Sequence, residues 1–272
     1  MIKLIEKDMP EVSLLDMALM IEQELGELDM AKVEAELAQL STQLACYLAD
    51  RSSARNDSSS QTWQDVLACF FQQWQFSGDW QQFFDYQNTL VSQGILKRKG
   101  TPLTLGILLV HFLRQSGVTA NGICFPGHFL VRIDVDNNFH YIDPFNGELL
   151  SWQQMELKLR GAKGDLARLK QQDLKPDDIK SIIKRLLHTK KGALLREHQF
   201  NQALRCSDIL LRLAPGDPFE IRDRGFIFHE LDCFNVAVDD FNYFIDKCPN
   251  DPSIGLLKLK IEQMDHSETV MH

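Results

Sequence analysis

Residues 117–148 read GVTANGICFPGHFLVRIDVDNNFHYIDPFNGE, and this stretch decides the fold. It contains three short segments rich in β-branched and aromatic side chains, at 120–125, 128–135 and 139–142. A Pro-Gly pair separates the first two segments, and Asp-Asn-Asn separates the last two. Turn formers between short apolar runs predict neighbouring strands of a small antiparallel sheet.

Two ionisable side chains flank the second predicted hairpin. His128 stands at the start of one strand and Asp143 at the end of the next. With a turn at 136–138 the two positions come side by side, because antiparallel neighbours run in opposite directions. A carboxylate there would fix the tautomer of the ring and raise its basicity, as the orienting member of a catalytic triad does. We therefore expect a His128–Asp143 pair, which could be a catalytic site or a half-buried structural contact.

A helix is predicted directly before these strands. Thr101 can cap it, Pro102 suits its first position, and an apolar run follows as far as Gln115. Unpaired N–H groups and the helix dipole favour an anion at such a start, so a nucleophile for the histidine is expected there. No cysteine lies between Cys69 and Cys124, so the predicted helix start lacks a thiol.

Two other side chains are alternatives for the nucleophile. Thr104 carries a hydroxyl one turn into the helix, but threonine needs strong activation by a base, and the hydroxyl could simply bond back to a carbonyl. Cys124 precedes His128 by about 13 Å along an extended strand at ~3.3 Å per residue, too far for proton transfer unless the Pro-Gly pair folds the chain back. We assign His111 and His140 no role.

The first third of the chain is predicted to be helical. Apolar residues recur at helical spacing over 13–50 with one break, which indicates a helix pair. Residues 50–62 have no large apolar side chain and are expected to form an exposed, mobile loop. Helical spacing resumes at Trp63, and a further helix is expected to begin near Asp79. Helices followed by a run of strands predict the α+β class.

The last third shows an internal repeat of 34 residues, which is the tetratricopeptide period. The recurring positions are Ala203 and Ala237, Pro215 and Pro249, and Asp217-Pro218 and Asp251-Pro252. Helix pairs are predicted at 184–214 and 219–248. Two units do not bury a continuous core, so a helix at 179–187, a helix after Pro252 or the first domain should complete the array.

The polar, charged stretch at 161–178 is expected to be the linker. The predicted domains are then a core with N-terminal helices at 1–160 and helical repeats at 176–265.

Composition and charge exclude several classes of function. Lys and Arg number 29 against 38 Asp and Glu, a net charge of −9 without a basic stripe, so nucleic-acid binding is not expected. The apolar run at 103–113 is far too short to cross a membrane, and charges in the first residues argue against a secretory signal, so we expect a cytoplasmic protein. Six cysteines without a CxxC pair indicate no disulfide framework or zinc site, and no metal or cofactor is expected.

The arrangement resembles the transglutaminase-like superfamily. In that superfamily a glycine–x–cysteine begins a helix ending in arginine–x–x–glycine, followed by strands carrying glycine–histidine and aspartate–proline. The corresponding residues here are Gly100, Arg114, Gly117, Gly127-His128 and Asp143-Pro144. The resemblance implies a thiol site assisted by His128 and Asp143. When the segments are aligned without gaps, the cysteine position falls on Pro102.

From about residue 80 to 252 the chain is similar to the bacterial SirB-type family, which joins such a core to C-terminal tetratricopeptide repeats. The similar residues are Asn88-Thr89, Arg98, Gly100, Pro102-Leu103-Thr104-Leu105, Phe125 to Arg132, Asp143-Pro144-Phe145 and Arg222-Asp223-Arg224-Gly225. The resemblance implies that the thiol position is usually not cysteine, and it implies an association with the regulation of invasion genes. The block at 222–225 could contact a ligand or form an internal ion pair that ties the repeats to the first domain.

These observations favour a catalytically degenerate transglutaminase-like core that serves, through its repeats, as a regulatory scaffold for a protein or peptide partner. His128, Asp143 and Thr104 are then residues of a vestigial site. The alternative is a hydrolase or acyl transferase in which Thr104 or Cys124 acts with His128 and Asp143.

Overall fold

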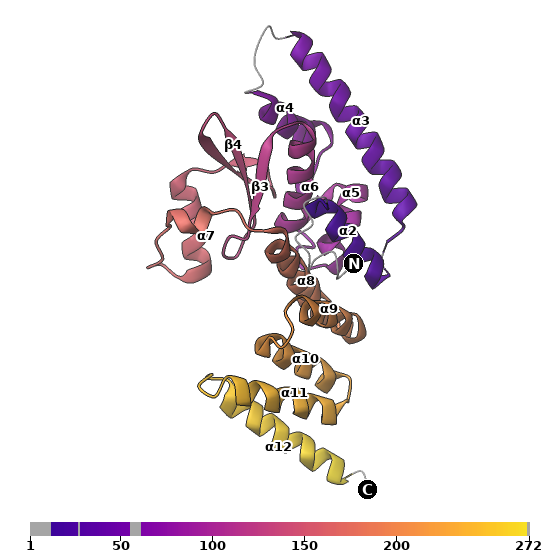
Figure 1. The fold of residues 1–272 in the computed structure, drawn as a ribbon, viewed down its shortest axis with the longest axis vertical. Helices are drawn as coiled ribbons and strands as arrows, with labels where there is room; N and C mark the ends of the chain where they lie inside the picture. Colours follow the sequence, from indigo (N-terminus) through magenta and orange to yellow (C-terminus); the bar gives the residue numbers. More distant parts are fainter. Residues whose placement is uncertain (1–11, 27, 55–60, 271–272) are drawn as a thin grey trace. The chain divides into compact units, whose positions relative to one another are not determined.

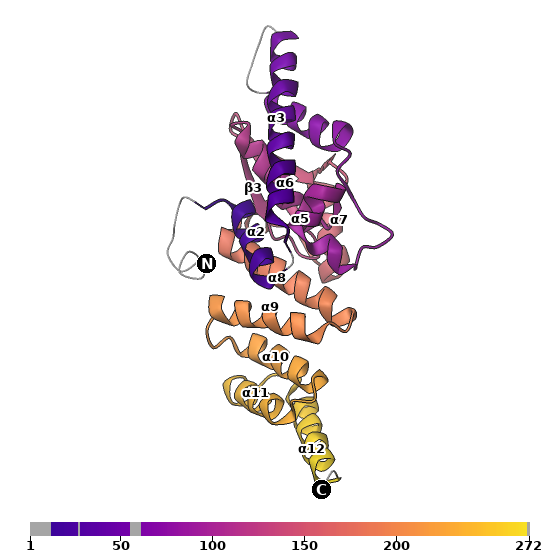
Figure 2. The same ribbon diagram turned by 90° about the vertical axis from the view of Figure 1, so that its right-hand side faces the viewer.

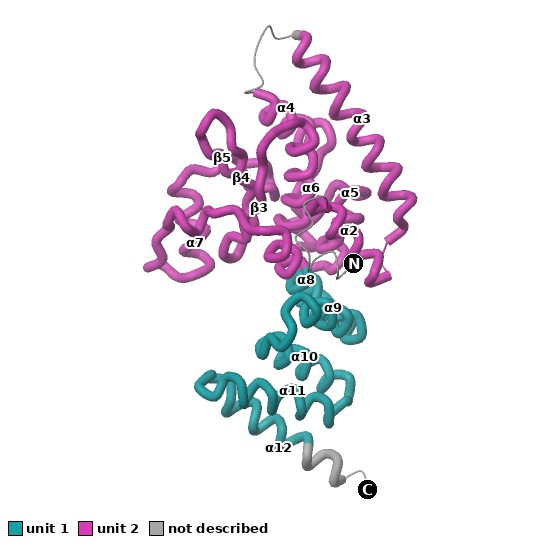
Figure 3. The backbone as a smooth tube through the Cα atoms, in the orientation of Figure 1, with its two compact units in different colours: residues 1–8, 187–272 teal, residues 9–186 magenta. Residues whose placement is uncertain are grey.

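In a computed structural model of the protein, residues 12–26, 28–54 and 61–270 are described, with the backbone alone for residues 54 and 265–270. The chain forms two compact units (Figure 3): one spans residues 9–186, and the other contains residues 187–272. We call them the sheet unit and the helical unit. The first is α+β and the second all-α, so the predicted fold class is confirmed.

A four-stranded antiparallel sheet in the order β3–β4–β5–β6 forms the centre of the sheet unit (Figure 1). Val135 pairs with Asn138 across a tight turn, in which Asp136 and Asn137 have φ of 49° and 61°. Positive φ at both central residues is the geometry of a type I′ hairpin turn. The strands are β3 (Thr119–Ile123), β4 (Leu130–Val135), β5 (Asn138–Asp143) and β6 (Glu148–Leu149).

The second strand begins two residues later than the sequence predicts. The N–H of His128 donates to the carbonyl of Phe125 at 3.0 Å, and Gly127 has φ of 69°, so residues 125–128 form a turn. β3 and β4 pair beyond that turn, with Ile123 opposite Leu130. His128 therefore lies on a turn at the end of the sheet.

Helices cover both faces of the sheet. α6 packs against β3 and β4, and α7 packs on the other face through Met155 and Leu159 (Figure 1). The start of α6 is as predicted, because the side chain of Thr101 accepts the N–H of Thr104 at 3.1 Å and Pro102 is the first helical residue. The helices are α2 (Leu14–Leu25), α3 (Met30–Ala54), α4 (Thr62–Ala68) with the π-helical turn Cys69–Gln73, α5 (Val91–Lys97), α6 (Pro102–Gln115) and α7 (Trp152–Lys163).

The predicted loop at 50–62 is wrong at its start. Residues 50–54 belong to α3, whose hydrogen bonding extends past the last large apolar side chain. Residues 55–60 of the predicted loop lie outside the described residues.

The helix expected near Asp79 is also wrong. The chain first forms β1 (Ser77–Gly78), which pairs in parallel with β2 (Lys99–Gly100). The carboxylate of Asp79 then accepts the N–H groups of Gln81 at 3.1 Å and Gln82 at 3.0 Å, a local turn that competes with helix formation. Bends continue to the 3₁₀ helix Tyr86–Thr89.

The segment predicted as a linker, 161–178, packs onto the sheet unit. Leu169 and Leu174 are buried in one cluster with Ile123 and Leu130 of the sheet. The boundary between the two compact units falls later, inside α8 (Ile179–Arg196). The polar composition of the segment predicted a linker, but two of its leucines are buried in the core of the sheet unit.

The helical unit contains antiparallel helix pairs that follow one another in chain order (Figures 1 and 2). Ala203 and Ala237, the repeated small residues, are fully buried. The predicted helix at 179–187 is the beginning of α8 itself, and the helix after Pro252 packs on α11 through Leu257. The helices beyond α8 are α9 (Phe200–Leu213), α10 (Pro218–Glu230), α11 (Phe234–Lys247) and α12 (Ile254–Val270).

Candidate functional site

The structure brings His128 and Asp143 together at the end of the sheet. The turn before β4 carries the histidine, and Asp143 is the last residue of β5. Nε2 of His128 lies 2.9 Å from Oδ1 of Asp143. The two side chains are 17% and 3% exposed, so the pair is largely shielded from water. Hairpin pairing accounts for the meeting, as the strand pattern predicts.

Asp143 has two further partners. Its Oδ1 accepts the N–H of Phe145 at 2.9 Å, and its Oδ2 accepts a hydrogen bond from the ammonium of Lys158 at 2.8 Å. Burial by itself would raise the pKa of Asp143, but the His128 ring, the Lys158 ammonium and the Phe145 N–H outweigh it and lower the pKa to about 2. The carboxylate is therefore ionised and shared between two basic groups.

Lys158 is a site residue that sequence reasoning missed. It lies on α7, fifteen residues after Asp143, and contacts the carboxylate because α7 packs against the sheet. One lysine on a helix surface is an ordinary residue in the sequence. Its contact with the carboxylate depends on tertiary packing.

The His128 ring is close to the carboxylate but not well aligned with it. Nε2 is buried and lies 2.9 Å from Oδ1 of Asp143, in a direction that is poor for a hydrogen bond. With Nε2 turned toward the carboxylate, Nδ1 is the ring nitrogen left for a reacting group.

Thr104 does not offer a reactive hydroxyl. It is fully buried, donates its proton to the carbonyl of Asn88 at 2.9 Å, and lies 2.8 Å from the hydroxyl of Thr101. Its methyl group lies against Gly94 and Gly100, on the side of α6 that faces α5 and β2. The Thr104 hydroxyl therefore bonds to a backbone carbonyl, which is the structural role considered for it in the sequence analysis.

The opposite side of α6 packs against the residues that follow the pair in sequence. A Cβ placed on Gly106 would lie 2.4 Å from Phe129 and 3.4 Å from Pro144, the residues that follow His128 and Asp143. Pro102 precedes Gly106 by four residues and so lies on the same helix face. The helix position on which the resemblance places the nucleophile is Pro102, an imino acid without a reactive group.

Cys124 is close to the turn but has a poorly reactive thiol. Because residues 125–128 fold the chain back, the distance along an extended strand does not apply to Cys124 and His128. Burial, reinforced by the negative charge of Asp177, raises the pKa of the Cys124 thiol to about 12. A thiol with this pKa is protonated at neutral pH and is a poor nucleophile.

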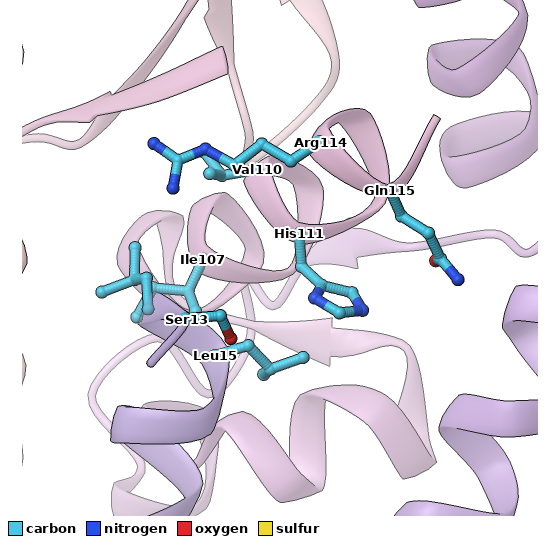
Figure 4. Close-up of a pocket in the computed structure, with 8 residues that line it drawn as sticks. Ser13, Leu15, Ile107, Val110, His111, Arg114 and Gln115 are labelled. Carbon is cyan, nitrogen blue, oxygen red and sulfur yellow. The ribbon is translucent and has the colours of Figure 1, made fainter. Parts of the chain in front are cut away.

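His111 and His140 lie in other surroundings. His111 borders a cavity of about 130 Å³ between α2 and α6, where Leu15 and Gln115 are near its ring and the Arg114 side chain points away (Figure 4). Burial lowers the pKa of His111, so its ring is neutral at pH 7. His140 stacks on Trp63 at 4.7 Å between ring centroids.

The block at 222–225 ties helices of the helical unit together. Asp223 accepts a hydrogen bond from Lys191 of α8 at 3.2 Å, and Arg224 makes a two-pronged contact with Asp240 of α11 at 2.7 and 2.8 Å. Lys191 also donates to both oxygens of the buried Glu220, at 2.7 and 2.8 Å. These contacts support the ion-pair alternative for the block, and the ion pairs join helices of the helical unit to one another.

Within the described part of the chain, no group of three or more His, Cys, Asp or Glu side chains is arranged to hold a metal ion. The helices described there also include none with the length and apolar character required to cross a membrane.

A histidine–aspartate pair beside a helix start, on an antiparallel sheet that precedes 34-residue helix pairs, defines a transglutaminase-like core with tetratricopeptide repeats. The family description Transglutaminase-like superfamily matches residues 31–188, more than half of the chain, and Tetratricopeptide repeat matches 190–262. The chain belongs to the transglutaminase-like superfamily, in the group whose relatives are called SirB1 and UPF0162.

The relatives cover most or all of the chain. A UPF0162 protein of Vibrio cholerae is 38% identical over the whole of both chains. Protein SirB1 of Salmonella typhimurium and UPF0162 protein YchA of Escherichia coli are each 34% identical, over 77% of this chain and 78% of theirs. No solved structure matches the chain.

Proposed function

We propose that the protein is a cytoplasmic, regulatory scaffold whose transglutaminase-like site has lost catalysis and whose helical repeats bind a protein or peptide partner. The observation that carries the proposal is the state of the nucleophile positions: Pro102 has no reactive group, the Thr104 hydroxyl is bonded to a carbonyl, and the Cys124 thiol has a pKa of about 12. A base without a side-chain nucleophile cannot form the covalent acyl-enzyme through which a thiol site of this kind acts.

The second support is the sharing of Asp143. In a catalytic triad the carboxylate serves the histidine, whereas here its other oxygen is bonded to Lys158. This arrangement favours a buried ionic cluster that holds β5, the histidine turn and α7 together.

An exposed stripe on α10 supports peptide binding by the helical unit. Phe219 and Phe226 are 50% and 40% exposed and lie on one helix face with Arg222 between them. The Arg222 guanidinium is 5.5 Å from the Phe219 ring centroid, and the Lys260 ammonium of α12 is 5.8 Å from that of Phe226. Aromatic and cationic side chains of this kind are common anchors at protein interfaces.

The catalytic part is tested with generic acyl substrates, amine incorporation into a glutamine-containing protein, and electrophilic probes followed by mass spectrometry. We expect no turnover and no adduct at Thr104 or Cys124. An activity that disappears in His128→Ala would refute the scaffold proposal and support the alternative, a hydrolase or acyl transferase, for which the 2.9 Å His128–Asp143 contact is the favouring observation.

The binding part is tested by capture of partners from cell extract with the full chain, identified by mass spectrometry and remeasured with purified components. The double variant Phe219→Ala/Phe226→Ala should lose the same partner. Leu157→Ala, which removes a 70% exposed side chain from α7, is the matched control and should retain it. Equal binding by all three proteins would exclude the α10 stripe as the binding surface.

A further inference from the structure

Three aromatic side chains project from the turn region at residues 79–85. Trp80 is 76% exposed, Phe83 39% and Phe84 60%. Large aromatic side chains in water lose the free energy that burial would give, and a cluster of them usually marks an interaction surface. We call Trp80, Phe83 and Phe84 the aromatic loop.

The backbone of the aromatic loop is fixed by hydrogen bonds. The Asn88 amide donates to the carboxylate of Asp79 at 3.3 Å and to the carbonyl of Gln82 at 2.7 Å. The carboxylate of Asp85 accepts the N–H of Gln87 at 2.7 Å. The loop is held at both ends while its rings are 39–76% exposed, so a partner would meet a preorganised surface.

The aromatic loop is continuous with the His128–Asp143 site. The Trp80 and Phe83 rings contact the Phe145 ring edge-on, at 4.4 and 5.7 Å between centroids. Phe145 in turn donates its N–H to Asp143. Phe145 therefore connects the exposed rings to the His128–Asp143 pair.

The charges beside the rings indicate which kind of partner fits this surface. Asp79 and Asp85 flank the rings, and the Lys99 ammonium near Asp79 donates a hydrogen bond to the Ser77 hydroxyl at 2.8 Å. The whole chain has a net charge of −9, which disfavours both a second copy of the chain and an anionic membrane surface. An apolar segment flanked by basic residues has the complementary character.

We propose that the aromatic loop is a docking surface for a short polypeptide segment of a partner protein, with apolar side chains that contact Trp80 and Phe84 and with flanking Lys or Arg residues that face Asp79 and Asp85. This surface is separate from the α10 stripe and does not depend on the proposed function. Binding at the aromatic loop can therefore be tested independently of binding at the α10 stripe.

The test uses the full chain and three fluorescein-labelled synthetic peptides that share the same apolar centre. The flanks are lysine in the first, serine in the second and glutamate in the third. By fluorescence anisotropy, the lysine peptide should bind at least about tenfold more tightly than the glutamate peptide, and raising the salt from about 0.05 M to about 0.3 M should reduce the difference.

Variants separate the rings from the charges. Trp80→Ala should weaken binding of the lysine-flanked peptide about tenfold, as loss of an aromatic anchor does. Phe139→Ala removes a 54% exposed ring from β5 and should leave binding unchanged. Asp79→Asn/Asp85→Asn keeps the oxygens that accept the N–H groups of Gln81, Gln82 and Gln87, loses the 3.3 Å bond from the Asn88 amide to Asp79, and should abolish the preference for lysine over glutamate. Circular dichroism melting verifies that each variant is folded.

Several results would overturn the proposal. One is the absence of binding by all three peptides at about 1 mM, and another is equal affinity for lysine and glutamate flanks. A third is self-association in analytical ultracentrifugation that Trp80→Ala removes, because the occupant would then be a second copy. Binding to phosphatidylglycerol vesicles that depends on Trp80, without peptide binding, would identify a lipid surface instead.

Discussion

Asp143 is a buried carboxylate that accepts the Phe145 N–H and lies against two basic side chains, His128 and Lys158. Desolvation of the carboxylate is unfavourable, and these contacts more than offset it, since the pKa falls to about 2. The free-energy consequence is a pH-dependent contribution to folding. It is present whether or not the site has any chemistry.

The sign of that contribution follows from linkage. The folded pKa of Asp143, about 2, is below the ordinary value of 3.8, so the stabilisation is fully present above pH 3.8 and is lost as pH falls toward 2. We predict that Asp143→Asn lowers the free energy of unfolding by about 2 kcal/mol at pH 7. Urea titrations from pH 7 to pH 2 should show the difference from wild type shrinking below pH 4. Asp136→Asn, in the exposed hairpin turn, is the matched control.

Pro102 provides a second test at the residue scale. If position 102 faces the His128 ring, the thiol of Pro102→Cys should be activated by the helix start and by the imidazole. We predict that this thiol reacts with iodoacetamide at pH 6 at least about tenfold faster than buried Cys69, whose thiol pKa is raised to about 11 by burial. The rate should fall in Pro102→Cys/His128→Ala. Peptide mapping by mass spectrometry measures each site, and equal rates at 102 and 69 would contradict the assignment of the face.

Among the elements, α6 determines the geometry of the site. Its side chains divide into a face toward α5 and β2, which holds Thr104, and a face toward the sheet, where Gly106 admits the Phe129 ring. The close approach of helix and turn depends on the absence of a Cβ at this position.

We therefore predict that Gly106→Ala destabilises the sheet unit by about 1–3 kcal/mol, although alanine is the better helix former, because its Cβ would lie 2.4 Å from Phe129. The matched control is Gly161→Ala on α7, where no atom lies within 4 Å of the added Cβ. That change should stabilise by up to about 1 kcal/mol. Changes of opposite sign in the free energy of unfolding, measured by urea titration, would support the packing argument. Stabilisation by both substitutions would refute it.

At the scale of the whole molecule, each unit has a core of its own. The cluster around Ile123, Met155 and Leu174 belongs to the sheet unit, and the cluster around Phe241, Phe244 and Leu257 belongs to the helical unit. The helical unit also has a buried ionic contact, in which Lys191 and Glu220 are 5% and 3% exposed. Breaking such a contact from one side leaves a buried charge unpaired.

Glu220→Ala should accordingly destabilise the helical unit by about 3–5 kcal/mol. We expect amide hydrogen exchange to become faster in α9, α10 and α11 while the protection of β3 to β5 is unchanged. Glu230→Ala, at a side chain that is 50% exposed, should alter neither region. Loss of protection throughout both units would show that they unfold as one.

Much of the fold is determined by the sequence because its signals are local. Thr101 and Pro102 specify the start of α6, the Asp-Asn-Asn turn sets the β4–β5 hairpin, and a 34-residue period specifies the helix pairs. The His128–Asp143 meeting follows from the same hairpin logic. Each depends on residues close in the chain or on a regular spacing.

Tertiary structure decided the rest. The contact of Lys158 with Asp143, the carbonyl partner of Thr104 and the parallel pairing of β1 with β2 join residues distant in sequence, and no local pattern encodes them. The expected helix at Asp79 failed because a side-chain turn and that strand pairing outweighed helical spacing. The sequence by itself determines which groups the chain possesses, and packing decides which of them are available for chemistry or binding.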